Sequence, residues 1–392
     1  MQKIKQDRGS IQVSPNPRAI RDGTLRISAC VTEPDKDPWD LWFELPASCE
    51  EQVASGGDPF ALALVFLAMS RDLDLVVHDR VSPLLLRNLE EFQAAFHAWY
   101  PHRYCPITIH ADDEEEGPVT PPDAPVIAGF SGGLDSSFSI YRHVMRAAGR
   151  RTVSIGCGLM VHGFDIPVDD PITFENAFRK ASDSLSSIGL SLIPVRTNLK
   201  AMLDLSWRGI HGALLASCLH LFSGSYSAGL IAGTYHYART GLISHGSNPL
   251  TDPLMSSGTF RIIHDGAEYF RTQKAYAIRE WSAAMDNLRV CWEGERLDRN
   301  CGRCSKCIRL ITAFWANGLP APQSFDVLPT SSDIRGLQLA NVDYLDPVCE
   351  ILDLADKNGL TDESWLQDLR ICFERNREWF VNSTETIATQ LS

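Results

Sequence analysis

The residues best suited to chemistry form a glycine- and serine-rich loop, Gly129–Ser137, with the sequence GFSGGLDSS. The loop follows an apolar run, Ala124–Phe130, that reads as a buried strand, and it precedes a helical pattern. A helix N-terminus presents unpaired backbone N–H groups and a partial positive charge, which together attract anions. Gly132 and Gly133 allow the backbone to curl closely around such an anion. The loop therefore predicts a phosphate-binding site.

Polar side chains within the loop refine this prediction. Ser131 and Ser136 supply hydroxyl donors. The Asp135 carboxylate would repel phosphate unless a divalent cation lay between them, so we expect Mg²⁺ to bridge the two. A Walker loop is excluded because no lysine follows Gly133. The alternative is a Gly-Ser turn that merely begins a helix, with Asp135 at its favourable end.

A second chemical cluster is made of cysteines. The spacing C-x9-C-x2-C-x2-C can chelate one ion in a tetrahedron of thiolates, and a glycine inside the cluster, Gly302, permits the tight turn. We favour a structural Zn²⁺ site. An iron–sulfur cluster and ordinary buried thiols are the alternatives. The four expected ligands are Cys291, Cys301, Cys304 and Cys307.

The phosphate loop resembles the SGGxDS signature of the PP-loop ATP pyrophosphatases. The resemblance implies cleavage of ATP between its α- and β-phosphates and transfer of AMP to a substrate oxygen. It also implies a HUP-type fold, in which adenine nucleotide alpha-hydrolases are grouped. The positions that it assigns to ATP are Ser131, Gly132, Gly133, Leu134, Asp135, Ser136 and Ser137.

Two other strand ends fit an adenosine pocket in that family. One predicted strand leads into His162, and another leads into Gly233 and Thr234. The carboxyl ends of parallel strands are where open α/β sheets bind ligands. The alternative for His162 and its neighbour Asp165 is that they only cap a turn.

The phosphate loop and the cysteine cluster together resemble the 7-cyano-7-deazaguanine synthase (QueC-like) family. The match includes the knuckle Cys301–Cys307, CGRCSKC, and spans roughly Ala124–Trp315. It implies an ATP-dependent ligase that adenylates a carboxylate, expected to be that of 7-carboxy-7-deazaguanine, releases pyrophosphate and then forms a C–N bond. Lys274 is carried over as a catalytic cation near the phosphates, beside Asp135.

The chain departs from the family pattern in its substrate loop. Where the family has SGYPDCR, this sequence has His245–Pro253, HGSNPLTDP. A substrate-binding role for His245, Ser247 and Asp252 competes evenly with a solvated turn. The extra N-terminal and C-terminal regions are similar to the branch of this family in bacterial anti-phage operons of the CBASS type, which implies ammonia or a protein amine as the acceptor.

Patterns along the chain predict α/β architecture with a doubly wound parallel sheet. Strand-like and helical segments alternate after an acidic, proline-rich stretch, residues 111–123, which we interpret as a linker. An α+β domain is expected before it at 1–110, the PP-loop domain with its zinc knuckle at 124–318, and a helical region at 319–392. Expected helices include Thr272–Met285, Glu363–Glu374 and Trp379–Gln390.

Composition limits the partners. With 36 Lys and Arg against 49 Asp and Glu, the net charge of −13 disfavours general nucleic-acid binding. The longest apolar run, Phe60–Met69, is too short to span a membrane, and the N-terminus lacks a signal-like core. Eleven cysteines without an export signal then indicate a cytoplasmic, reducing environment. The oligomeric state stays open, with a dimer as one expectation.

Two other functions remain as alternatives. Some PP-loop enzymes adenylate tRNA bases and insert sulfur, although the acidic surface argues against such a thiolase. The other is a nucleotide-sensing scaffold without catalysis, against which the complete loop weighs.

Overall fold

A computed structural model describes residues 8–121, 123–240, 244–339 and 344–390. The described chain divides into two compact units. The sheet unit contains the residues up to Ser131, together with 142–171 and 188–267; the helical unit contains 132–141, 172–187 and the residues from Glu268 onward. Among the described residues, no helix combines the length and the hydrophobicity needed to cross a bilayer.

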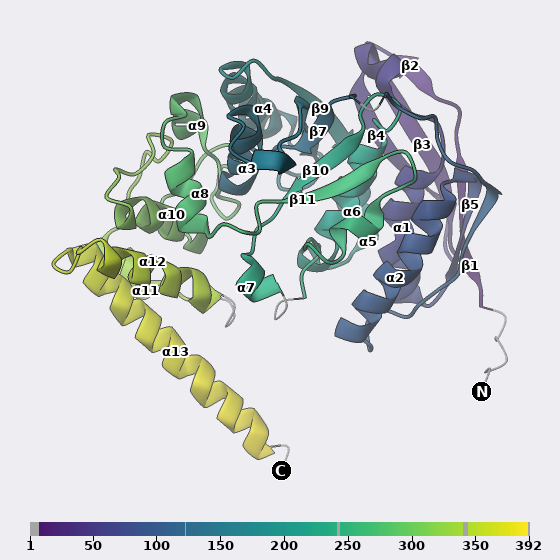
Figure 1. Cartoon of the computed structure of the whole chain (residues 1–392). Helices are drawn as coiled ribbons and strands as arrows, with labels where there is room; N and C mark the ends of the chain where they lie inside the picture. Colours follow the sequence, from purple (N-terminus) through teal and green to yellow (C-terminus); the bar gives the residue numbers. More distant parts are fainter. Residues whose placement is uncertain (1–7, 122, 241–243, 340–343, 391–392) are drawn as a thin grey trace. The chain divides into compact units, whose positions relative to one another are not determined.

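The sheet unit is built on one mostly parallel sheet of 11 strands (Figure 1). Its strands, in spatial order, are β11 (Arg261–Asp265), β10 (Ala228–Ala232), β7 (Val126–Gly129), β8 (Ile155–His162), β9 (Ser191–Thr197), β4 (Trp39–Pro46), β3 (Thr24–Thr32), β1 (Ser10–Pro15), β5 (Asp74–Val81) and β6 (Ile109–Glu114), with β2 (Ala19–Arg21) paired to β3. Every residue of β7 is buried, as expected for an apolar strand between two parallel neighbours. The expected α/β class is confirmed.

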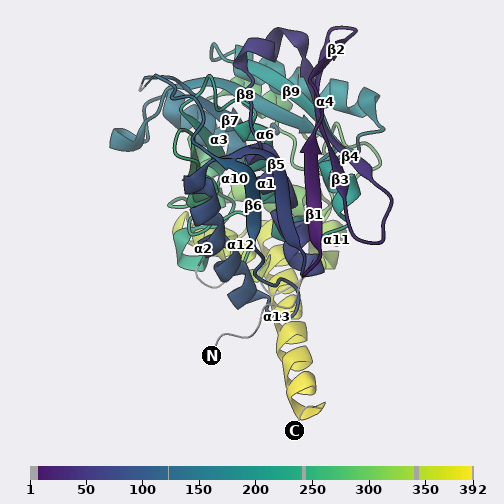
Figure 2. The same cartoon turned by 90° about the vertical axis from the view of Figure 1, so that its right-hand side faces the viewer.

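The N-terminal strands join the same sheet rather than a separate one. β4 pairs antiparallel with β9, and Thr197 Oγ1 donates to the Trp42 carbonyl at 2.7 Å. Figure 2 shows β1, β3, β4 and β5 side by side. Strands from before and after residues 111–123, which we expected to be a linker, therefore belong to one sheet. Residues 111–114 of that segment belong to the edge strand β6, whose acidic side chains face solvent and protect the edge from pairing with another chain.

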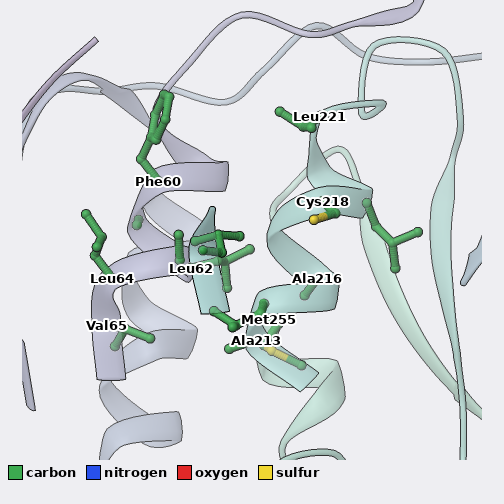
Figure 3. Packing of buried hydrophobic residues seen from close by; sticks show 14 of the residues in the cluster. Phe60, Leu62, Leu64, Val65, Ala213, Ala216, Cys218, Leu221 and Met255 are labelled. Atoms are coloured by element: carbon green, nitrogen blue, oxygen red, sulfur yellow. The ribbon is translucent and has the colours of Figure 1, made fainter. Parts of the chain in front are cut away.

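One face of the sheet is covered by long helices. These are α1 (Asp58–Arg71), α2 (Pro83–Trp99) and α6 (Trp207–His220). Figure 3 shows apolar side chains of α1, including Leu62 and Val65, packed against Ala213 and Ala216 of α6. α1 is buried along nearly its whole length, which explains the apolar run in the sequence. The smaller helical segments are η1 (Ala47–Gln52), η2 (Gly149–Arg151), α5 (Leu199–Leu203), α7 (Tyr237–Thr240) and η3 (Asp252–Met255).

In the described part of the helical unit, two apolar clusters share one helix. Its elements are α4 (Pro171–Ser186), α8 (Arg271–Ala277), α9 (Ser282–Asn287), α10 (Ser305–Ala316), α11 (Ser331–Gly336), α12 (Leu345–Lys357) and α13 (Ser364–Gln390), with the start of α3 (Leu134–Val144). One cluster joins Leu134 and Phe138 of α3 to Phe314 of α10. The other joins Ile308 of α10 to the C-terminal helices. The helical tail therefore packs on the helix that follows the cysteine knuckle.

Two expected helices differ in extent. The helix expected over Thr272–Met285 is broken into α8 and α9, because the Trp281 indole turns inward, stacks on Tyr141 with ring centroids 5.2 Å apart and donates to Ser187 Oγ. The two expected C-terminal helices are the single helix α13. Its Asn376 side chain exchanges hydrogen bonds with the backbone of Leu337 and Leu339, which anchors the middle of the helix.

Candidate functional site

The phosphate loop follows β7 and precedes α3, as the sequence predicts. Gly132 has φ +73°, a left-handed conformation that favours glycine, and its carbonyl accepts a hydrogen bond from the Arg289 N–H at 2.8 Å. Ser136 Oγ donates to the Gly133 carbonyl at 3.1 Å, which closes the loop on itself. The loop thus leads from a buried strand into the first turn of a helix.

The loop residues differ in exposure. Ser131, Gly133 and Asp135 are half-buried, whereas Leu134 and Ser137 are only 1% exposed. Leu134 packs in the apolar cluster of the helical unit. We expected Leu134 to be among the residues that contact the nucleotide. Its side chain is instead part of the core and stabilises the start of the helix.

Asp135 is held by two cations from α8. Arg271 Nη1 donates to Asp135 Oδ2, and Lys274 Nζ lies 3.1 Å from Asp135 Oδ1. Burial raises the pKa of Asp135, but the nearby charges of Arg271 and Lys274 outweigh it and keep the pKa below its usual range. The pairing of Asp135 with Lys274 thus brings together the two residues expected to be catalytic. Arg271, beside Lys274 in the sequence, was not among the predicted site residues.

The expected Mg²⁺ bridge at Asp135 does not fit this arrangement. Both carboxylate oxygens already accept hydrogen bonds from cationic side chains. A divalent cation on the same carboxylate would be repelled by the adjacent charges of Arg271 and Lys274. The positive charge that we expected from an ion is supplied in this structure by Arg271 and Lys274.

A half-buried carboxylate from the C-terminal region supports the same helix. Glu350 Oε1 of α12 accepts from the Thr272 backbone N–H at 2.7 Å and from the Thr272 hydroxyl. Burial raises the pKa of Glu350. This contact fixes the first turn of α8, which carries Arg271 and Lys274. Glu350 lies in a tail that the sequence marked only as packing structure, so no local signal pointed to it.

The predicted substrate residues belong to the sheet unit and meet around one buried carboxylate. Asp252 is fully buried and accepts from Ser247 Oγ at 2.7 Å and from the Asn248 N–H at 3.1 Å. His264 Nδ1 lies 2.7 Å from Asp252 Oδ2. Ser247 and Asp252 are thus tied together, and the loop has a buried anchor rather than being a solvated turn.

His245 lies beside the same anchor. Its Nδ1 is 3.1 Å from the Ser247 carbonyl, and its ring contacts His211 and Tyr235 with centroids 4.5 and 5.0 Å apart. Burial, and then the proximity of His211, lowers the pKa of His245 to about 3. His245 is therefore a neutral hydrogen-bond donor near pH 7.

The two predicted adenosine-contacting strand ends take different forms. His162 is 3% exposed, and its Nε2 lies 2.8 Å from the Pro167 carbonyl, so it closes the turn after β8. Burial lowers its pKa. Gly233 donates to the Asp265 carbonyl at 2.7 Å, and a Cβ at this position would lie 2.5 Å from His264 Nε2. Only glycine fits there. Thr234 follows it and is half-buried.

The cysteine cluster lies in the helical unit and fits a tetrahedral metal site. The Sγ atoms of Cys291, Cys301, Cys304 and Cys307 all lie within 4.8 Å of one another. Cys291–Cys304 and Cys301–Cys307 have Sγ–Sγ distances of 3.7 and 3.9 Å. Four sulfurs bound to Zn²⁺ at about 2.3 Å are separated by about 3.8 Å. The cluster could therefore hold a zinc ion.

The backbone around the cluster is held in place by two residues. Asn300 Oδ1 accepts from the Val290 and Cys291 N–H groups, while its Nδ2 donates to the Leu288 carbonyl at 2.7 Å. Gly302 has φ +74°, and a Cβ there would lie 2.0 Å from the Val327 carbonyl oxygen. These contacts bring the distant ligand, Cys291, to the other three.

Comparison of the chain with family models, with curated proteins and with solved structures found no match.

Proposed function

We propose that this protein is an ATP-dependent ligase that adenylates a carboxylate and then forms a C–N bond. The observation that carries the proposal is the sequence GFSGGLDSS at the junction of a buried strand and a helix. Its resemblance to the PP-loop signature supports ATP as the cosubstrate. The knuckle CGRCSKC and its resemblance to QueC-like enzymes support a 7-deazaguanine carboxylate as the acceptor of AMP.

The proposed reaction has two steps. In the first, a carboxylate oxygen attacks the α-phosphorus of ATP and pyrophosphate leaves, which gives an acyl adenylate. In the second, an amine nitrogen attacks the acyl carbon, loses a proton, and expels AMP. The carboxylate needs this activation because oxide is a poor leaving group. Ammonia or a protein amine is the nucleophile; the resemblance to the anti-phage branch supports the latter and a role in defence.

Positive charge beside the loop supports the first step. Lys274 and Arg271 are held on Asp135 within the helical unit, and pyrophosphate accumulates negative charge as it departs. Fixed cations stabilise such charge more effectively than mobile solvent does. In this proposal Asp135 orients both side chains. Mg²⁺ arrives with ATP rather than on a resident carboxylate.

Pyrophosphate exchange tests the proposal. Protein, MgATP and 7-carboxy-7-deazaguanine should incorporate labelled pyrophosphate into ATP, and exchange should require the acid. Lys274→Gln should lower the exchange rate by about 100-fold or more, comparable to the loss of one oxyanion-type donor. Arg279→Gln, which removes a half-buried cation just after the same helix, is the matched control and should keep wild-type exchange. Absence of acid-dependent exchange in the wild type would refute adenylation of this acid.

A further inference from the structure

The two cations that pair with Asp135 are carried by a very short helix. α8 has 7 residues, and Arg271 and Lys274 are among its first four. An isolated helix of this length is not stable in water, because ordering its residues costs more free energy than its few hydrogen bonds return. Contacts from outside α8 must therefore fix the helix and, with it, the reach of both cationic side chains.

The first turn of α8 is not capped by its own N-cap residue. Phe270 occupies the N-cap position, and its ring carries no oxygen that could accept from the first N–H groups. Gln273 Oε1 accepts from the Phe270 N–H at 2.9 Å, so this side chain satisfies the N-cap residue and not the turn itself. The N–H groups of the turn need an acceptor from another part of the helical unit.

Glu350 of α12 supplies that acceptor. Its Oε1 accepts from the Thr272 N–H at 2.7 Å and from the Thr272 hydroxyl, although the two residues are 78 positions apart in the chain. A carboxylate is also the favourable charge for the N-terminal end of a helix. Asn317 Nδ2 donates to the Thr272 carbonyl at 3.0 Å. Thr272, which is 3% exposed, is thus held through its N–H, its hydroxyl and its carbonyl.

The core of the helical unit fixes Glu350 in turn. Val348 and Ile351, on either side of it in α12, are buried and pack in one apolar cluster with Ile308 of α10 (Figure 1). Closely packed side chains leave little freedom for the backbone between them. The half-buried Glu350 carboxylate therefore holds the start of α8 at a defined place relative to this core.

We propose that Glu350 is a positioning residue for the adenylation step. The inference rests on the proposed function, because the groups that Glu350 positions are the cations that stabilise the departing pyrophosphate. Glu350 acts through Thr272 and the first turn of α8 on Arg271 and Lys274. A displacement of a charged group by about 1 Å can lower a rate by about 100-fold, since stabilisation of developing charge requires donors that are already in place.

Acid-dependent exchange of labelled pyrophosphate into ATP tests this role. Glu350→Ala removes the acceptor, so it should lower the maximal rate by about 10- to 100-fold. It should also raise the KM for pyrophosphate, a constant that does not depend on how much of the protein is folded. Glu350→Gln keeps an amide oxygen for both Thr272 donors and should stay within about threefold of the wild type.

Asp353→Ala removes an exposed carboxylate from the same helix and is the matched control, which should behave as the wild type. Wild-type exchange in Glu350→Ala would overturn the proposal. An equal loss in Glu350→Gln and Glu350→Ala would also overturn it, because the acceptor would then not be what matters.

Calorimetric titration with inorganic pyrophosphate separates this inference from the proposed function, because binding requires no catalysis. The wild type and Glu350→Gln should bind pyrophosphate about 10-fold more tightly than Glu350→Ala. That pattern without acid-dependent exchange would count against adenylation alone. No binding by the wild type, or equal binding by Glu350→Ala, would overturn the positioning role. If Glu350→Ala does not fold, Thr272→Val removes the hydroxyl donor instead and should weaken binding; unchanged binding would then refute the proposal.

Discussion

Lys274 Nζ lies 3.1 Å from Asp135 Oδ1, and only 1% of the Lys274 side chain is exposed to solvent. Asp135 therefore has two roles in the helical unit: it belongs to the phosphate loop, and it compensates a buried cation. A residue expected to serve only a ligand thus also stabilises the fold.

Asp135→Ala should lower both activity and stability. Removing the carboxylate takes away the counter-charge that Asp135 gives to buried Lys274, which costs about 3–5 kcal/mol of unfolding free energy. Chemical denaturation measures this loss. The double variant Asp135→Ala/Lys274→Met should recover much of the stability without recovering pyrophosphate exchange. A single variant as stable as the wild type would show that the ion pair contributes little.

Gly302→Ala should disrupt the cysteine knuckle. The new Cβ would lie 2.0 Å from the Val327 carbonyl oxygen, so the backbone must move and shift the thiolates. Gly318→Ala is the matched control, because its φ of +70° is similar but nothing lies within 4 Å of the added carbon. We expect the control to cost about 1 kcal/mol and to keep its metal, and Gly302→Ala to cost more and to bind Zn²⁺ more weakly. Metal analysis and thermal denaturation measure both effects. If both variants lost equal amounts of stability and of bound Zn²⁺, the positive φ alone, and not the close contact with Val327, would explain the effect.

Asp252→Asn should destabilise the sheet unit by about 2 kcal/mol or more, because an amide cannot accept from Ser247, Asn248 and His264 as the carboxylate does. Asp169→Asn, at an exposed position, should have little effect. Urea denaturation compares the two. A urea denaturation curve for Asp252→Asn that overlays that of the wild type would mean that the buried anchor is dispensable.

His245 should make stability depend on pH below about 6.5. Its pKa is lowered to about 3 in the folded protein, so the unfolded chain binds a proton that the folded chain does not. The sign follows: stability falls as the pH drops from about 6.5 toward 3, by at most about 1.4 kcal/mol per unit. His245→Gln should have a shallower slope in this window, while His102→Gln, at an exposed site, should keep the wild-type slope. Identical slopes would contradict the buried, neutral state of His245.

The sequence by itself determined the elements that local patterns encode. The apolar run Phe60–Met69 lies in α1, and the strand–loop–helix around GFSGGLDSS is present where predicted. The short spacing of four cysteines also predicted that their sulfur atoms lie close together. In each case neighbours along the chain carry the information, because period, turn residues and chelate spacing act over a few residues.

Only the tertiary structure decided which distant residues meet. Several contacts join segments that are separated by many elements. They are the pairing of β4 with β9, the contacts of Arg271 and Lys274 with Asp135, the contact of Glu350 with α8, and the approach of His220 to Asp58. Such contacts follow from how helices and strands pack, and packing depends on the shape and burial of whole surfaces rather than on any local pattern. For that reason Lys274 and the loop could be predicted as site residues from the sequence. That Arg271 and Lys274 both pair with Asp135 could be seen only in the fold.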